Sequence, residues 1–147
     1  MEDTDIGETR ENFAWFNKIS TRWIDMDVYG HVNNVQYYSF FDSAVAEHLI
    51  QYGELDPKNS PEIGLVIETK CTFHKSIPFP AIINVGLRVS RIGKTSVTYE
   101  IGLFLNEELT PAATGYFVHV YVDRSSQKPV AIPEERRKAM EMLLVSN

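Results

Sequence analysis

Cysteine and long apolar segments are both scarce in this sequence. Cys71 is the one cysteine among 147 residues, so no internal disulfide can form and no oxidising compartment is required. No run approaches the roughly 20 apolar residues of a membrane-spanning helix. The first residues are acidic, whereas a secretory signal begins with basic residues. These absences predict a cytoplasmic protein that does not use a membrane.

Excess positive charge is missing as well. The chain contains 14 Lys and Arg residues against 20 Asp and Glu residues, a net charge of −6. Residues 1–11 contain five acids and one base, which predicts an acidic, flexible N-terminal tail. The rest of the chain is nearly balanced and offers no basic field for nucleic-acid phosphates. Nucleic acid is therefore not an expected partner, although a local basic patch could still bind a small phosphorylated ligand.

The composition is otherwise that of a globular domain, with 44% hydrophobic and 23% charged residues. No repeat or Pro/Ser-rich linker divides the chain, so residues 12–147 are predicted to form a single domain. Residues 13–24 are rich in aromatic and β-branched types and predict a strand.

Residues 34–52 change to the period of an amphipathic helix. Asn33 or Asn34 can cap its first turn, and Gly53 is a natural end. Asp42 falls inside the apolar stripe, where a buried carboxylate needs a hydrogen-bonding partner. The stripe consists of Val35, Tyr38, Phe41, Val45, Leu49 and Tyr52.

Four further segments have the character of strands, and a short helix is expected at 133–144. Because the order is strand, long helix and four strands, we expect an α+β fold in which one helix covers one antiparallel sheet. In the first of the four strands, alternation places Cys71 on the apolar side, as a core residue. That side consists of Leu65, Ile67, Thr69, Cys71 and Phe73, and the four strands are 64–75, 82–91, 95–105 and 112–123.

The segment between the first strand and the long helix is too polar for a plain connector. Residues 25–34 contain two acids, a glycine, a histidine and two amides. The segment delivers a carboxylate to a helix N-terminus, where unpaired N–H groups and the helix dipole favour negative charge. A carboxylate beside such an oxyanion site suits the hydrolysis of acyl groups.

This segment resembles a known family signature. Asp25-Met26-Asp27-Val28-Tyr29-Gly30-His31-Val32-Asn33-Asn34, with Tyr38 and Asp42, is similar to the D-x-D-x-x-G-H-V-N-N-x-x-Y pattern of 4-hydroxybenzoyl-CoA thioesterase-like proteins of the hotdog-fold superfamily. The resemblance implies a five-stranded antiparallel sheet wrapped around the long helix. It also implies a second copy paired edge to edge, as a homodimer or homotetramer, with active sites at the subunit interface.

The resemblance places the catalytic carboxylate on Asp27. The thioester carbonyl would face the amides around Asn33 and Asn34, and Asp27 would attack it directly or activate a water. His31 would orient Asp27 or contact substrate, or would be a structural residue. The plainer interpretation of Asp27 itself is an acid that stabilises the turn before the helix.

Other polar residues of the segment have structural interpretations. Asp25 is expected to pin the connector by accepting backbone hydrogen bonds, and Gly30 to let the chain turn into the helix. Asp42 is expected to hold a buried hydrogen bond beneath the loop. A metal site is not expected, because no second histidine or carboxylate follows at helical spacing.

Coenzyme A requires positive charge for its phosphates. Arg88, Arg91 and Lys94, with Ser96, lie on or beside one predicted hairpin and are candidates for that contact, although a solvated strand end would look the same. By resemblance, Tyr38 and Asn33 would contact substrate. Glu68 would either enter the partner's pocket or stay exposed on its strand.

The sequence as a whole predicts an acyl-CoA thioesterase acting on a fatty acyl or aryl thioester, with coenzyme A as part of the substrate and no other cofactor. An acyl-carrier-protein thioesterase and a non-catalytic acyl-thioester-binding protein remain alternatives. A hydratase of the same superfamily is less favoured, because the longer Asp and His signature of those enzymes is absent.

Overall fold

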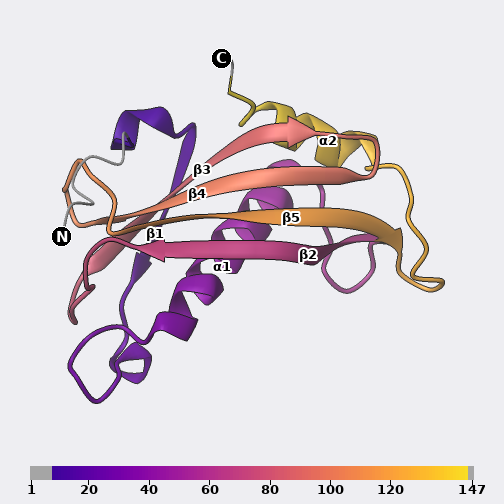
Figure 1. The fold of residues 1–147 in the computed structure, drawn as a ribbon. Coiled ribbons are helices and arrows are strands. Elements are labelled where there is room, and N and C mark those ends of the chain that lie inside the picture. Colours follow the sequence, from indigo (N-terminus) through magenta and orange to yellow (C-terminus); the bar gives the residue numbers. More distant parts are fainter. Residues whose placement is uncertain (1–7, 146–147) are drawn as a thin grey trace.

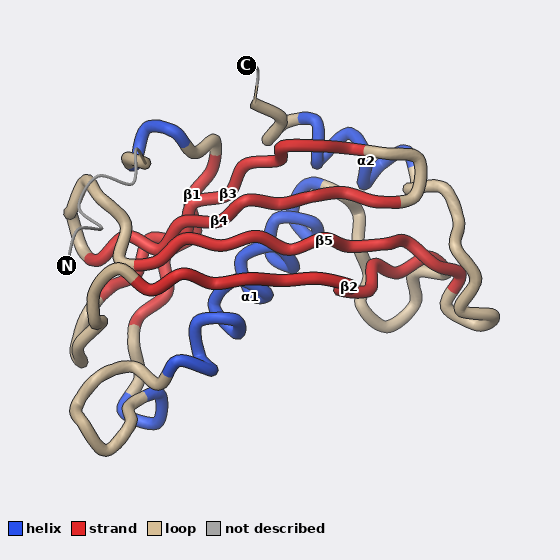
Figure 2. The backbone as a smooth tube through the Cα atoms, in the orientation of Figure 1, coloured by secondary structure: helices blue, strands red, loops and turns tan. Residues whose placement is uncertain are grey.

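The computed structural model describes residues 8–145, in which five antiparallel strands form one sheet (Figure 1). The long helix α1 (Asn34–Tyr52) crosses one face of the sheet, and the short helix α2 (Glu134–Glu141) lies at one end. Figure 2 shows the same arrangement by secondary structure. The predicted α+β architecture is confirmed. The strand order is β1 (Trp15–Ser20), β3 (Ile82–Ile92), β4 (Ser96–Leu105), β5 (Ala113–Asp123) and β2 (Glu62–Phe73).

The long helix has the predicted bounds but turns a different face to the sheet. Val35 and Tyr38, predicted to be buried, are 61% and 36% exposed. Apolar side chains occur on most sides of this helix, so periodicity alone allowed more than one orientation, and contact with the sheet selects between them. The buried residues of α1 are Tyr37, Phe40, Phe41, Ala44, Val45, His48 and Leu49.

The prediction that Asp42 holds a buried hydrogen bond is wrong. Its side chain is exposed, and it makes no hydrogen bond within the described part of the chain. The orientation of α1 explains this, because it leaves Val35, Tyr38 and Asp42 on the solvent side, where a carboxylate needs no buried partner.

A β-bulge in β2 changes which side chains face the helix. The pairing with β5 shifts register between Val66 and Glu68. On the C-terminal side of the bulge, Thr69 and Cys71 face α1 as predicted. On the N-terminal side the alternation is reversed, so that Leu65 faces outward, because the extra residue moves every preceding side chain to the other face.

The outer face of the sheet is covered in part by the residues that precede β1. Phe13 packs edge-on against Phe104, with ring centroids 5.6 Å apart. This close approach needs glycine beneath it, since a Cβ on Gly86 or Gly102 would lie 2.8 Å from an aromatic ring.

The N-terminal segment is anchored from residue 8 onward. The Arg10 N–H donates to the Leu109 carbonyl at 3.0 Å, and its guanidinium donates to the carbonyls of Asn106 and Glu108. The predicted flexible tail of residues 1–11 is therefore wrong for residues 8–11, which long-range hydrogen bonds hold in place. Residues 1–7 lie outside the described residues.

Within the described residues, no helix has the length and apolar character needed to cross a membrane.

Candidate active site

The segment before α1 forms a closed turn that presents Asp27. The Asp27 N–H donates to the His31 carbonyl at 2.8 Å, and Met26 and Val32 form an isolated β-bridge. Gly30 has a φ of 81°, a left-handed conformation that glycine adopts without strain. The turn that was expected of Gly30 is therefore present.

The Asp27 carboxylate is fixed by one of its two oxygens. Its Oδ1 accepts the backbone N–H groups of Tyr29, at 2.8 Å, and His31, at 3.2 Å. Its Oδ2 has no hydrogen-bond donor within residues 8–145, and the residue is only partly buried. Asp27 thus stabilises the turn through one oxygen and keeps the other available, so the structural and chemical interpretations of this residue are compatible.

The N-terminus of α1 leaves one backbone amide free beside this carboxylate. The Asn33 side chain caps the helix by accepting the Val35 N–H at 3.2 Å. The Asn33 N–H is itself used, because it donates to the Asp25 carbonyl at 2.8 Å. The Asn34 N–H has no acceptor among the residues that the structure describes, so it, and not that of Asn33, is the donor available to a ligand.

Both groups line one cavity with a volume of about 330 Å³. Tyr37 forms part of its wall and packs edge-on against Phe73, with centroids 4.8 Å apart. Burial, with smaller effects of Cys71 and Asp27, raises the pKa of Tyr37 to about 12, so its hydroxyl stays protonated. The complete lining is Asp27, His31, Val32, Asn34, Tyr37, Phe73, His74, Lys75 and Ser76.

Asp25 differs from Asp27 in its burial and in having both carboxylate oxygens bonded. Its side chain is fully buried, and it accepts the Arg22 N–H at 2.8 Å and the Arg22 guanidinium at 2.7 Å. These bonds also end β1 earlier than the predicted strand 13–24, because residues 23–25 form a 3-10 turn closed by this carboxylate. Asp25 is therefore the pin of the connector that the sequence predicted.

The predicted catalytic residues Asp27, His31 and Asn34 come together, but two predicted contact residues do not join them. Tyr38 lies on α1 against Phe41 and is not part of the cavity wall, where its neighbour Tyr37 stands instead. Glu68 lies on the outer face of the sheet, and its carboxylate accepts the Tyr116 hydroxyl at 2.6 Å. Within one chain, neither residue reaches the Asp27 cavity, and their contacts with substrate remain predictions.

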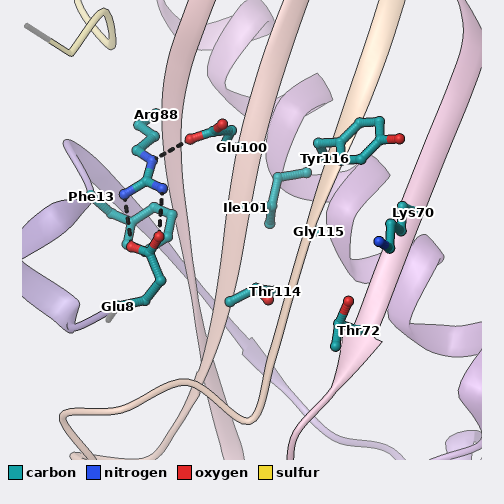
Figure 3. Close-up of a pocket in the computed structure, with 10 residues that line it drawn as sticks. All are labelled: Glu8, Phe13, Lys70, Thr72, Arg88, Glu100, Ile101, Thr114, Gly115 and Tyr116. Carbon is teal, nitrogen blue, oxygen red and sulfur yellow. Dashed lines mark hydrogen bonds and ion pairs between the residues drawn. The ribbon is translucent and has the colours of Figure 1, made fainter. Parts of the chain in front are cut away.

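Arg88 is occupied by its own chain on the outer face of the sheet (Figure 3). Its guanidinium binds Glu8 through two bonds of 2.9 Å and Glu100 through one of 2.7 Å. Its Cζ also lies 4.6 Å from the centre of the Phe13 ring. These two carboxylates match the charge of Arg88, which disfavours the predicted contact with coenzyme A. The pocket around it has a volume of about 280 Å³.

Arg91, Lys94 and Ser96 lie around the hairpin that joins β3 and β4. In Figure 1 this hairpin and the loop that carries Asp27 are at opposite ends of the sheet. Arg91 and Lys94 are exposed. One chain therefore does not bring these residues to its own Asp27 cavity.

The sequence did not identify four polar residues of the cavity wall, which are Tyr37, His74, Lys75 and Ser76. His74 donates to or accepts from the Thr114 hydroxyl at 2.9 Å, and Lys75 is paired with Glu108. Ser76 completes the set. Only Tyr37 could have been found from the local sequence, because it lies one helical turn after Asn34 and therefore on the same side of α1.

Two other kinds of chemistry find no support in the described residues. No group of three or more His, Cys, Asp and Glu side chains in residues 8–145 is arranged to hold a metal ion. Burial raises the pKa of the Cys71 thiol to about 12, which disfavours the thiolate that a nucleophile requires.

The chain is similar to known proteins over most of its length. The family model of the thioesterase-like superfamily matches residues 21–140. The PA5185 protein of Pseudomonas aeruginosa is 50% identical, with 95% of this chain and 97% of that chain covered and a TM-score of 0.93. The PA2801 protein of the same species is 27% identical, over 87% and 98% of the two chains, with a TM-score of 0.79.

Two more distant similarities complete the comparison. The uncharacterized protein YsmA of Bacillus subtilis is 25% identical, over 94% of this chain and 92% of its own length. The Dynemicin thioesterase, at 14% identity, covers 90% of this chain and 99% of its own with a TM-score of 0.83, which shows a shared fold. The predicted hotdog fold is confirmed.

Proposed function

Because the chain belongs to the thioesterase-like superfamily, we propose that it hydrolyses acyl-CoA thioesters to a free acid and coenzyme A. The proposal is carried by the cavity at the start of α1, where the free oxygen of Asp27 and the free amide of Asn34 meet. The acyl group is a fatty acyl or aryl group. The function is inferred from the site and not from the fold, since one fold supports many reactions.

The thioester carbonyl oxygen accepts the Asn34 N–H in this mechanism. As the carbonyl carbon becomes tetrahedral, its oxygen gains negative charge, which the N–H and the dipole of α1 stabilise. A single donor of this kind typically contributes about 3 to 4 kcal/mol to transition-state stabilisation. The cap formed by Asn33 fixes the direction of the amide.

Asp27 supplies the second half of the reaction by one of two routes. As a nucleophile, Oδ2 bonds to the carbonyl carbon, the coenzyme A thiolate leaves, and water then hydrolyses the acyl anhydride and restores the carboxylate. As a general base, Oδ2 takes a proton from a water that attacks the carbon, and the thiolate leaves with that proton. A single turnover in ¹⁸O-labelled water supports the first route if the label appears in Asp27, which occurs when water attacks the aspartyl carbon of the anhydride, because the second route never places the label there.

A second copy of the chain completes the site in this proposal. The outer edge of β2 has no neighbouring strand in the described chain, and Ile67 on it is 62% exposed. Two copies paired antiparallel through β2 bring the β3–β4 hairpin of one toward the Asp27 end of the other. Arg91, Lys94 and Ser96 of the partner then face the coenzyme A phosphates. A homotetramer would add a second such dimer.

This arrangement has its own test. Sedimentation velocity is expected to show a dimer or a tetramer. An Arg91→Ala/Lys94→Ala variant is expected to raise KM for an acyl-CoA while leaving KM for the matching acyl-pantetheine, which lacks the nucleotide, unchanged. An equal rise for both substrates would remove these residues from the phosphate site.

The activity itself is tested by the release of free thiol from a panel of saturated and aryl acyl-CoA esters. We expect hydrolysis by the wild-type chain and its loss in Asp27→Asn. Turnover of carrier-protein esters alone would redirect the proposal to that substrate class. Tight binding of acyl-CoA without thiol release would make the protein a binding module and overturn the proposal.

A further inference from the structure

A second cavity, of about 110 Å³, lies between α1 and the strands β2 and β5, apart from the Asp27 cavity. Val45 in its wall follows Tyr37 by eight residues, about 12 Å along a helix. The cavity therefore lies farther along the same side of the sheet, toward the C-terminal end of α1. Its lining includes Asp42, Val45, Gly64, His119 and Tyr121.

His119 is out of place in this mostly apolar wall. It is 5% exposed, and neither ring nitrogen has a hydrogen-bond partner within residues 8–145. Its ring packs against Tyr99 and Phe117, with centroids 5.6 and 5.5 Å away. Phenylalanine would fill this position without burying two unpaired nitrogens, so packing alone does not account for the imidazole.

Gly64 keeps one side of this imidazole open. A Cβ at position 64 would lie 3.4 Å from His119 Nδ1 and 3.3 Å from the ring of Tyr121. The missing side chain is therefore part of the cavity, and a methyl group there would cover Nδ1.

The charges around the cavity limit which ligand it can take. Burial lowers the pKa of His119 to about 4, so at neutral pH the ring offers one N–H donor and one acceptor nitrogen. Asp42 at the wall repels a carboxylate, and the lining contains no Lys or Arg. A hydroxyl group on an apolar ligand matches these features, because it donates and accepts and carries no charge.

We propose that this cavity receives the far end of the acyl group and that His119 selects acyl groups with a hydroxyl near that end. This inference rests on the proposed function, which places the thioester at Asp27. His119 is a specificity-determining residue and takes no part in making or breaking bonds.

The test compares saturated acyl-CoA esters with their ω-hydroxy counterparts over a series of lengths. At the length that reaches the cavity, wild-type kcat/KM is expected to favour the hydroxylated ester, and His119→Phe to lower that preference about tenfold. His119→Gln, which keeps a donor and an acceptor, is expected to retain most of it. Gly64→Ala is expected to reduce it, because the methyl group covers Nδ1.

His48→Phe is the matched control. His48 is also fully buried with both nitrogens unpaired, but it lies against Trp15 and Tyr52 and not in this wall. Its substitution is expected to leave the hydroxyl preference unchanged. A preference that His119→Phe and Gly64→Ala both leave intact, or that His48→Phe lowers equally, would overturn the inference.

A binding measurement separates this inference from the proposed function. Calorimetry of free fatty acids and ω-hydroxy fatty acids reports the His119 preference without any hydrolysis. Short acyl-CoA esters, which do not reach the cavity, report the reaction at Asp27 alone. Hydrolysis of short esters without a hydroxyl preference in either assay rejects the inference only, and a preference in binding without hydrolysis rejects the proposed function only.

Discussion

On the outer face of the sheet the Arg88 guanidinium is bound by two carboxylates, whereas on the helix side the Asp27 carboxylate keeps one oxygen free. Both groups are charged, lie in pockets and looked like ligand contacts in the sequence. Arg88 is neutralised by Glu8 and Glu100, so it has little left to offer a ligand. The comparison teaches that a charged group in a pocket is a candidate for function when part of it has no hydrogen-bond or ion-pair partner within the protein.

The largest expected effect on activity comes from Asp27, on the helix side of this comparison. Asp27→Asn keeps an oxygen for the Tyr29 and His31 amides but removes the negative charge. We expect kcat/KM for an acyl-CoA ester to fall between about 10² and 10⁴-fold, with thermal unfolding nearly unchanged. A variant that unfolds earlier and stays active would assign Asp27 to the turn alone.

The second effect comes from the two buried histidines on the helix side. Burial lowers the pKa of His48 and of His119 to about 4, below the value of about 6.5 in the unfolded chain. Between these pH values the unfolded chain binds more protons, so stability is lost as pH falls. The free energy of unfolding is expected to drop by about 1.4 kcal/mol per pH unit for each histidine in this window.

Denaturant unfolding between pH 7 and pH 4 measures this slope. His48→Phe/His119→Phe is expected to flatten it, while titrating carboxylates leave a smaller dependence in both proteins. An equal slope in the double variant would show that these histidines do not control acid stability.

A third, smaller effect separates Asp25 from Asp27. Asp25→Ala removes a buried acceptor and leaves the Arg22 N–H without its partner. We expect the free energy of unfolding to fall by about 1 to 3 kcal/mol, and activity to fall less than in Asp27→Asn. Chemical denaturation and the thiol-release assay check the two parts, and a stable but inactive Asp25→Ala protein would reverse the assignment.

The smallest effect concerns the outer face. Arg88→Met removes two partly exposed ion pairs but keeps the apolar stem over Phe13, so we expect a loss of about 1 kcal/mol in unfolding free energy. KM for acyl-CoA is expected to stay unchanged. A rise in KM for acyl-CoA, without one for acyl-pantetheine, would support the prediction that Arg88 contacts the nucleotide.

The sequence predicted best what neighbouring residues decide. The helix at 34–52 has the predicted bounds because Asn33 caps its start and Gly53 ends it. Asp27, His31 and Asn34 were expected together because eight consecutive residues hold them in one turn. The segments after α1 begin and end within about three residues of the predicted positions, since periodicity and turn residues mark them locally.

The sequence could not reveal contacts that depend on distant pairing. His74 and Lys75 reach the cavity because the Val32 N–H donates to the Ile77 carbonyl, and because β2 pairs with β5. The pairing of Arg88 was not foreseen because its partner Glu8 lies 80 residues away in the sequence. The reversed position of Leu65 follows from a bulge that no local pattern marks.

The two edges of the sheet differ in length, and this bears on how far copies can assemble. β2 has 12 residues and β1 has six. In the proposed dimer the β2 edge pairs with β2 of the other copy, so the continuous sheet has β1 as its edge strand on both sides. Because the two-fold contact pairs both β2 edges with each other, no β2 edge is left for a third copy. The exposed β1 edges are short, so they are poor templates for the growth of a fibril.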